Sequence, residues 1–89
     1  MIERELVIMN RLGLHARAAA RFVHLASRFR SRIQLVKDGL QVDGKSILGL
    51  LTLAGCQGSS LKLHVDGEDE EVAARELAAL VEGRFGESS

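Results

Sequence analysis

The sequence predicts an α+β fold, an open-faced β-sandwich in which a four-stranded antiparallel sheet carries three helices on one face. Short stretches alternate apolar and polar residues, as strands do when one face of their sheet is buried and the other meets solvent. Between them, apolar residues recur every three or four positions, which is the helical period. The two kinds of stretch follow one another in the order βαββαβα, and 46% of the 89 residues are hydrophobic. We therefore expect a single domain over residues 1–89 with one shared core.

The first strand and the first helix are predicted at residues 2–9 and 16–28. Leu6 and Ile8 fall on one face of the strand, because side chains alternate between the two faces. In the helical stretch, five apolar residues share the face expected to pack on the sheet: Ala19, Phe22, Val23, Ala26 and Phe29.

A hairpin and a short apolar helix are predicted next. Strands at 32–37 and 40–43 are separated only by Asp38-Gly39, a pair that suits a tight turn because glycine accepts a positive φ without steric cost. Residues 47–53 (ILGLLTL) are expected to form a helix. Its core-facing residues are predicted to be Ile47, Leu50 and Leu53.

The last strand and the last helix are predicted at residues 60–66 and 69–82. Leu61, Leu63 and Val65 alternate with polar residues and are expected to face inward. Acidic residues in the first turn of the helix suit the positive end of its dipole, and Gly83 is expected to end it. The ferredoxin-like fold has a closely related order, but the short second helix is less suited to the crossover in that fold.

The composition excludes several classes of function. Twelve Lys and Arg balance twelve Asp and Glu, so there is no basic excess to bind nucleic acid by phosphate neutralisation. Three phenylalanines are the only aromatic residues, which leaves little basis for stacking on bases. Cys56 is the single cysteine, and no apolar run approaches the roughly 20 residues that cross a bilayer. We expect a cytoplasmic monomer that binds neither nucleic acid nor membrane and needs no cofactor or metal ion.

Residues 10–17 (NRLGLHAR) predict a phosphate site. A strand ends here, Gly13 permits a turn, and His15 falls where a helix begins. Amide groups in the first turn of a helix lack intrahelical acceptors, and together with the helix dipole they bind anions. A neutral imidazole is a nucleophile toward phosphorus, and Arg17 can add a charge-assisted contact to phosphate oxygens. The chemistry indicated is reversible phosphorylation of His15; the alternative is a turn histidine with no chemistry.

Taken together, the motifs resemble the histidine-containing phosphocarrier family, HPr, of the bacterial phosphoenolpyruvate-dependent phosphotransferase system. The resemblance covers essentially the whole chain. It rests on Gly13-Leu14-His15-Ala16-Arg17, on Lys45-Ser46-Ile47-Leu48-Gly49 at the expected distance, on the Gly55/Gly58 break before a strand, and on Gly67-Glu68-Asp69-Glu70-Glu71 at the entry to the last helix.

The resemblance implies a carrier that is a substrate of enzymes rather than an independent catalyst. His15 would accept a phosphoryl group on Nδ1 from enzyme I and pass it to an A-type enzyme II domain, with Ala16 and Arg17 binding the group. Ala18 stands where the family usually has Pro. Proline fixes φ and alanine does not, so we expect a slightly looser turn. Because alanine is the best intrinsic helix former, we expect the helix start and its chemistry to be unchanged. The residues leave open whether the pathway is the sugar branch or the nitrogen-related branch.

Ser46 has two interpretations. From the residues alone, it is a favoured N-cap for the 47–53 helix. The family resemblance implies that it is also the target of an ATP-dependent HPr kinase/phosphorylase, and a phosphate there would add negative charge to a docking surface. The alternative function is a mainly regulatory or corepressor protein acting through phospho-Ser46. The presence of His15 with Gly13 and Arg17 favours the carrier.

Two sets of exposed residues are expected to dock partners. Offsets of three and four place basic side chains on one line along the first helix, the basic stripe: Arg17, Arg21, His24 and Arg28. Leu48 and Leu51 are expected to be partly exposed beside Ile47, and apolar residues rimmed by basic ones favour a transient interface. Residues 1–45 carry a formal charge of +5 and residues 46–89 carry −5, so the expected partners of the basic half are acidic.

Gly39 to Ser46 also match the P-loop pattern G-x-x-x-x-G-K-[ST]. The residues between the two glycines alternate like a strand, and Gly39 already serves the predicted hairpin. The pattern lacks the structural context that phosphate binding needs, so we expect no nucleotide hydrolysis.

Overall fold

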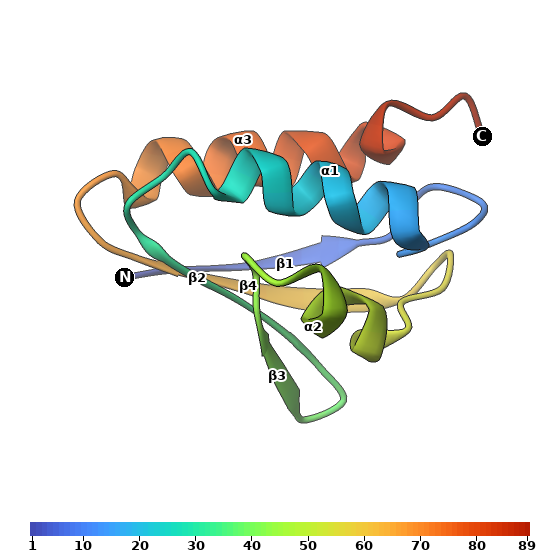
Figure 1. Cartoon of the computed structure of the whole chain (residues 1–89), viewed down its shortest axis with the longest axis horizontal. Coiled ribbons are helices and arrows are strands. Elements are labelled where there is room, and N and C mark those ends of the chain that lie inside the picture. Colours follow the sequence, from blue (N-terminus) through green and yellow to red (C-terminus); the bar gives the residue numbers. More distant parts are fainter.

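The four strands form one antiparallel sheet in the order β1-β4-β2-β3, and the three helices lie on one face of it (Figure 1). The computed structural model describes all 89 residues. The elements are β1 (Ile2–Val7), α1 (Ala16–Ala26), β2 (Arg32–Lys37), β3 (Leu40–Asp43), α2 (Ile47–Leu53), β4 (Ser60–Asp66), α3 (Glu70–Glu82) and a 3₁₀ turn (Arg84–Gly86). The predicted fold class and element order are confirmed.

The core lies between the sheet and the helices, and β4 is its central strand. β4 pairs with β1 on one side and with β2 on the other. Its residues Leu61, Leu63 and Val65 are buried, as their alternation predicts. They belong to one cluster of 20 buried apolar residues that includes Phe22 of α1 and Leu77 of α3. The Asp38-Gly39 turn also matches the prediction, since both residues have positive φ.

β1 and α1 each end two residues before the predicted position, and each early end has a local cause. β1 ends at Val7 instead of residue 9, because its partner β4 begins at Ser60, directly opposite Val7. α1 ends at Ala26 instead of residue 28. The amides of Arg28 and Phe29 donate to the carbonyls three positions earlier, which tightens the last turn and closes the helix.

Ile47 was predicted to face the core with Leu50 and Leu53, and this prediction was wrong. Leu50 and Leu53 are buried, whereas Ile47 is 43% exposed. Ile47 is the first residue of α2. Because helical side chains point back toward the N-terminus of their helix, the side chain of a first residue reaches past the end of the packed face.

α3 begins at Glu70 instead of residue 69, and Asp69 is its N-cap residue. The Asp69 carboxylate makes no hydrogen bond to its own helix. It accepts hydrogen bonds from the Arg30 amide at 2.9 Å, the Ser31 amide at 3.0 Å and the Ser31 hydroxyl. The chain that leaves α1 is thereby joined to the start of α3.

Acid titration of Asp69 is expected to weaken this junction. The hydrogen bond from the Ser31 hydroxyl, and next that from the Arg30 amide, lower the pKa of Asp69 from 3.8 to about 2. A folded-state pKa below the unfolded value means that the stabilisation is present above pH 3.8 and is lost as the pH falls toward 2. We predict that Asp69→Asn is less stable than the native protein at neutral pH and loses less unfolding free energy over that acid range. Urea unfolding at several pH values measures both, with Glu68→Gln, an exposed carboxylate without a hydrogen-bond partner, as control. Parallel pH profiles for Asp69→Asn and native protein would contradict the assignment.

Candidate functional site

The loop between β1 and α1 sets the position of His15. Gly13 has a φ of +67°, and its backbone lies so close to Gly55 that an added Cβ would come within 2.2 Å of the Gly55 carbonyl oxygen. The Leu14 amide donates to that same oxygen at 2.8 Å. Buried Asn10 closes the loop from the other side by donating from Nδ2 to the Gly13 carbonyl at 2.8 Å. These contacts direct the chain into α1 with His15 as the N-cap residue.

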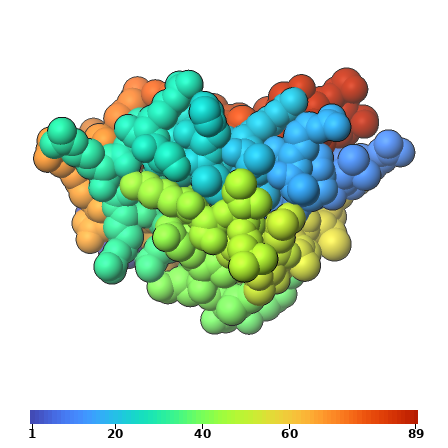
Figure 2. Space-filling model, viewed as in Figure 1, coloured from blue at the N-terminus to red at the C-terminus, as the bar shows by residue number.

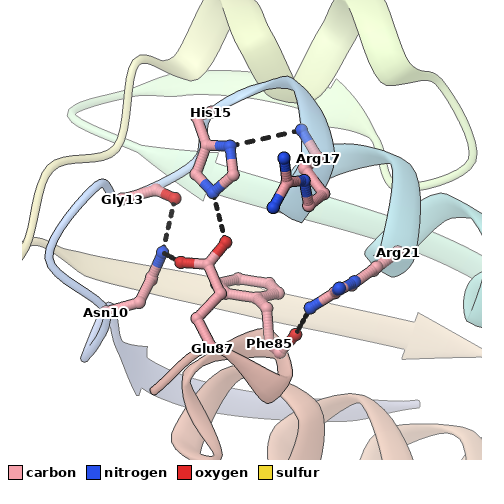
Figure 3. Close-up of polar contacts among 7 residues, drawn as sticks. All are labelled: Asn10, Gly13, His15, Arg17, Arg21, Phe85 and Glu87. Atoms are coloured by element: carbon pink, nitrogen blue, oxygen red, sulfur yellow. Dashed lines mark hydrogen bonds and ion pairs between the residues drawn. The ribbon is translucent and has the colours of Figure 1, made fainter. Parts of the chain in front are cut away.

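The two ring nitrogens of His15 have different partners (Figure 3). Nδ1 accepts a long hydrogen bond of 3.3 Å from the Arg17 amide, at the start of α1. Nε2 contacts the Oε2 atom of Glu87, which lies 72 residues away in the sequence. The His15 and Glu87 side chains are only 25% and 15% exposed. The imidazole therefore lies between a helix N-terminus at one nitrogen and a carboxylate at the other.

Glu87 is brought to His15 by the segment that follows α3. Arg84, Phe85 and Gly86 all have positive φ, which turns the chain sharply back toward the start of α1. Phe85 is fully buried in the core, and Arg21 of α1 donates to its carbonyl oxygen. The turn is thus held by one buried side chain and one hydrogen bond.

The Glu87 carboxylate is fixed by a second contact. Asn10 donates from Nδ2 to Glu87 Oε1 at 2.9 Å, while the other carboxylate oxygen contacts His15 (Figure 3). The hydrogen bond from Asn10 is the largest cause that lowers the pKa of Glu87, and the contact with His15 adds to it. Glu87 is therefore a carboxylate at neutral pH.

The start of α1 offers free donors beside Nδ1. The amides of Ala16 and Ala18 have no acceptor in the protein, and the Arg17 amide has only its long contact with the ring. Arg17 forms no ion pair, and Figure 3 shows its side chain beside the imidazole. Both residues line an open hollow of about 260 Å³ with Leu12, Glu87, Ser88 and Ser89. The arrangement can bind an anionic group next to a ring nitrogen.

The predicted docking residues belong to α1, its C-terminal end and α2, and these two helices lie side by side (Figure 2). All four members of the basic stripe are exposed, but Arg28 lies beyond the end of α1, and the Arg21 guanidinium is turned toward Phe85. Leu48 is 75% exposed and Leu51 is 38% exposed. With Ile47, which was also among the expected docking residues, they form an exposed apolar patch on α2.

Ser46 caps α2 as predicted. Its hydroxyl accepts a hydrogen bond of 3.0 Å from the Gly49 amide. Ser46 is outside the hollow at His15, so the two predicted modification sites are separate places on the surface.

The residues that match the P-loop pattern do not form a phosphate-binding loop, because Leu40–Asp43 form β3 and Gly39 lies in the hairpin turn.

Other candidate sites carry no cluster of ligands. No group of three or more His, Cys, Asp or Glu side chains is arranged to hold a metal ion. Cys56, the single cysteine, is exposed. No helix has the length and apolar character that a membrane span requires.

Sequence reasoning missed Asn10, Glu87 and the role of Arg21. Asn10 was taken only as part of the turn, and Glu87 only as part of the acidic half of the chain. One hint was present, since a polar Asn directly after an apolar strand has to find hydrogen-bond partners if it is buried. Nothing local to residue 87 indicates that it returns to His15.

Comparison with known proteins places the site in a family. A family model described as the PTS HPr component phosphorylation site matches residues 2–83. Phosphocarrier protein HPr of Xylella fastidiosa is 45% identical over 89 residues, which is 100% of both chains. Phosphocarrier protein HPr of Cupriavidus necator is 47% identical over 87 residues, 98% of each chain. A crystal structure of HPr from Thermoanaerobacter tengcongensis is 46% identical and superposes with a TM-score of 0.96 over the whole of both chains.

The sheet order and the match along the whole chain define a small phosphocarrier and not a catalytic enzyme. The chain belongs to the HPr family of the phosphotransferase system. A solved structure described as an HPr dimer from Thermoanaerobacter tengcongensis is also similar, with 47% identity and a TM-score of 0.78. The monomeric state expected from the sequence therefore stays a prediction.

The close approach at Gly13 makes it the most sensitive position in the loop. We predict that Gly13→Ala lowers the unfolding free energy by about 3 kcal/mol, because the added Cβ meets backbone and φ is positive. Gly39→Ala is the matched control, since Gly39 also has a positive φ but its added Cβ meets nothing within 4 Å. Its cost is the left-handed backbone alone, about 1 kcal/mol. Urea unfolding compares the two, and equal losses would show that contact with Gly55 does not matter.

Proposed function

We propose that His15 accepts a phosphoryl group on Nδ1 from phosphoenolpyruvate by way of enzyme I and transfers it to an A-type enzyme II domain. The observation that supports this most is the position of Nδ1 beside the free amides of the α1 N-terminus. The family match supports a role in the phosphotransferase system, and the sequence motif supports the choice of His15. We place the transfer in the cytoplasm.

The proposed step forms one bond and breaks one. The Nδ1 lone pair attacks phosphorus, the bond between phosphorus and the donor atom breaks, and its electron pair stays with the donor. The phosphoryl oxygens then accept from the Arg17 amide in place of the ring, and from the free Ala16 amide, with the Arg17 guanidinium beside them. The reverse displacement delivers the group to the next carrier.

Partner docking uses the surface around His15. The basic stripe of Arg17, Arg21, His24 and Arg28 attracts acidic partners, and the apolar patch of Ile47, Leu48 and Leu51 supplies the area that is buried on binding. The phosphoryl group must be passed on, so the contact with each partner has to be transient. An interface of exposed leucines rimmed by charge fits that need.

The central test is phosphorylation with a histidine removed. Incubated with phosphoenolpyruvate and enzyme I, the native protein is expected to take up acid-labile phosphate, and His15→Ala is expected to take up none. His64→Ala, which removes a histidine from the opposite face of the sheet, is the control and keeps the native level. Label that persists in His15→Ala would sink the proposal.

We also propose that Ser46 is phosphorylated by an HPr kinase/phosphorylase. The Ser46 hydroxyl already lies at the N-terminus of α2, where added negative charge is tolerated by the fold. It adjoins the apolar patch on α2. Negative charge there would repel the acidic partner that the basic stripe attracts.

A charge-mimicking variant tests this regulation. Ser46→Asp is expected to accept phosphate from enzyme I at least about fivefold more slowly at low salt, and by less at high salt, because like charges face each other. Ser46→Asn is the control, since it caps a helix as well as Asp but carries no charge. Equal transfer rates for Ser46→Asp and the native protein would contradict the repulsion.

A further inference from the structure

We propose that Glu87 is a positioning residue for His15, one that keeps the proton of the neutral imidazole on Nε2 and leaves the lone pair on Nδ1. The proposal rests on the proposed function, because it explains why Nδ1 and not Nε2 is the nucleophile. It assigns a role to a residue that lies beyond the family model, which ends at residue 83.

The hydrogen-bonding capacity of each partner fixes the tautomer. A neutral imidazole has one nitrogen that donates and one that accepts. The Glu87 carboxylate can only accept, so Nε2 must donate to it. The Arg17 amide can only donate, so Nδ1 must accept. The two partners require the same tautomer, and the proton position on one nitrogen follows from the bond at the other.

The protein holds Glu87 in place at a conformational cost. Two residues other than glycine, Arg84 and Phe85, lie in the left-handed region just before it. Such residues persist only where the surrounding structure determines them. Here buried Phe85, its hydrogen bond from Arg21, and the hydrogen bond from Asn10 to Glu87 do so. A turn that only had to end α3 would not need this set of contacts.

The carboxylate also matches the charge that develops in the reaction. When Nδ1 gains the phosphoryl group and Nε2 keeps its proton, the ring becomes cationic. The Glu87 oxygen at Nε2 stabilises that charge in a contact partly shielded from water. No proton has to leave the site during transfer.

An isosteric variant gives the sharpest test. Asn10 Nδ2 donates to Oε1, so in Glu87→Gln the amide oxygen is held by Asn10 and the amide NH₂ faces His15. The amide NH₂ can only donate, so Nε2 of His15 would have to accept and the ring proton would have to be on Nδ1. A buried amide in place of the carboxylate is known to misplace a histidine proton in this way. Glu87→Ala removes the partner without demanding the wrong tautomer.

We therefore expect three tautomer states by nitrogen NMR of the His15 ring at mildly alkaline pH. The native protein has the proton on Nε2, Glu87→Ala has a mixture, and Glu87→Gln has it mainly on Nδ1. Phosphorylation by enzyme I, measured as kcat/KM, falls about threefold to tenfold in Glu87→Ala and more than about tenfold in Glu87→Gln, on the scale of one charge-assisted hydrogen bond. Glu82→Gln, which removes a charge from the exposed end of α3, is the control and matches the native protein in both measurements.

The NMR result does not need a phosphoryl donor, so it separates this proposal from the proposed function. A native ring protonated on Nδ1, or an identical tautomer ratio in all three proteins, overturns the role of Glu87. A normal tautomer pattern without any phosphorylation of His15 leaves the positioning intact and rejects the carrier function. If Glu87→Ala fails to fold, the isosteric Glu87→Gln still decides between a donor and an acceptor at Nε2.

Discussion

The close contact between the Gly13 backbone and the Gly55 carbonyl is the constraint on which the site depends. It brings the loop after β1 against the loop after α2, although the two loops are far apart in the sequence. With Asn10 closing the other side, the chain has one way to enter α1, and His15 becomes its N-cap. The chemistry of the imidazole follows from that entry, because it decides which nitrogen meets the free amides.

The two halves of the sequence divide the work of the site. The first half supplies the histidine, the amides and most of the positive charge, while the acidic second half supplies the carboxylate that touches the ring. A chain with zero net charge can therefore carry a basic stripe along α1 and still keep one negative group at His15. The net charge is zero because the positive charge of the first half and the negative charge of the second half cancel.

Local features of the structure could be predicted, and contacts across the fold could not. The hairpin, the caps at His15 and Ser46, and the buried face of β4 all follow from residues close together in sequence. Glu87 differs because its partner is 72 residues away, and neither periodicity nor capping preference encodes such a pairing. The wrong orientation of Ile47 has another origin, since helical spacing describes the middle of a helix and not its first residue.

α1 is restrained at both of its ends by the two segments that flank α3. Asp69, just before α3, binds the amides that follow α1, and Glu87, just after α3, contacts the histidine that starts it. Sliding or turning α1 against the sheet would break one of these two junctions. The helix can thus meet successive partners as a rigid body, with little ordering entropy lost on each encounter. In the proposed cycle the protein docks twice, so it would gain from that rigidity both when it receives the phosphoryl group and when it delivers it.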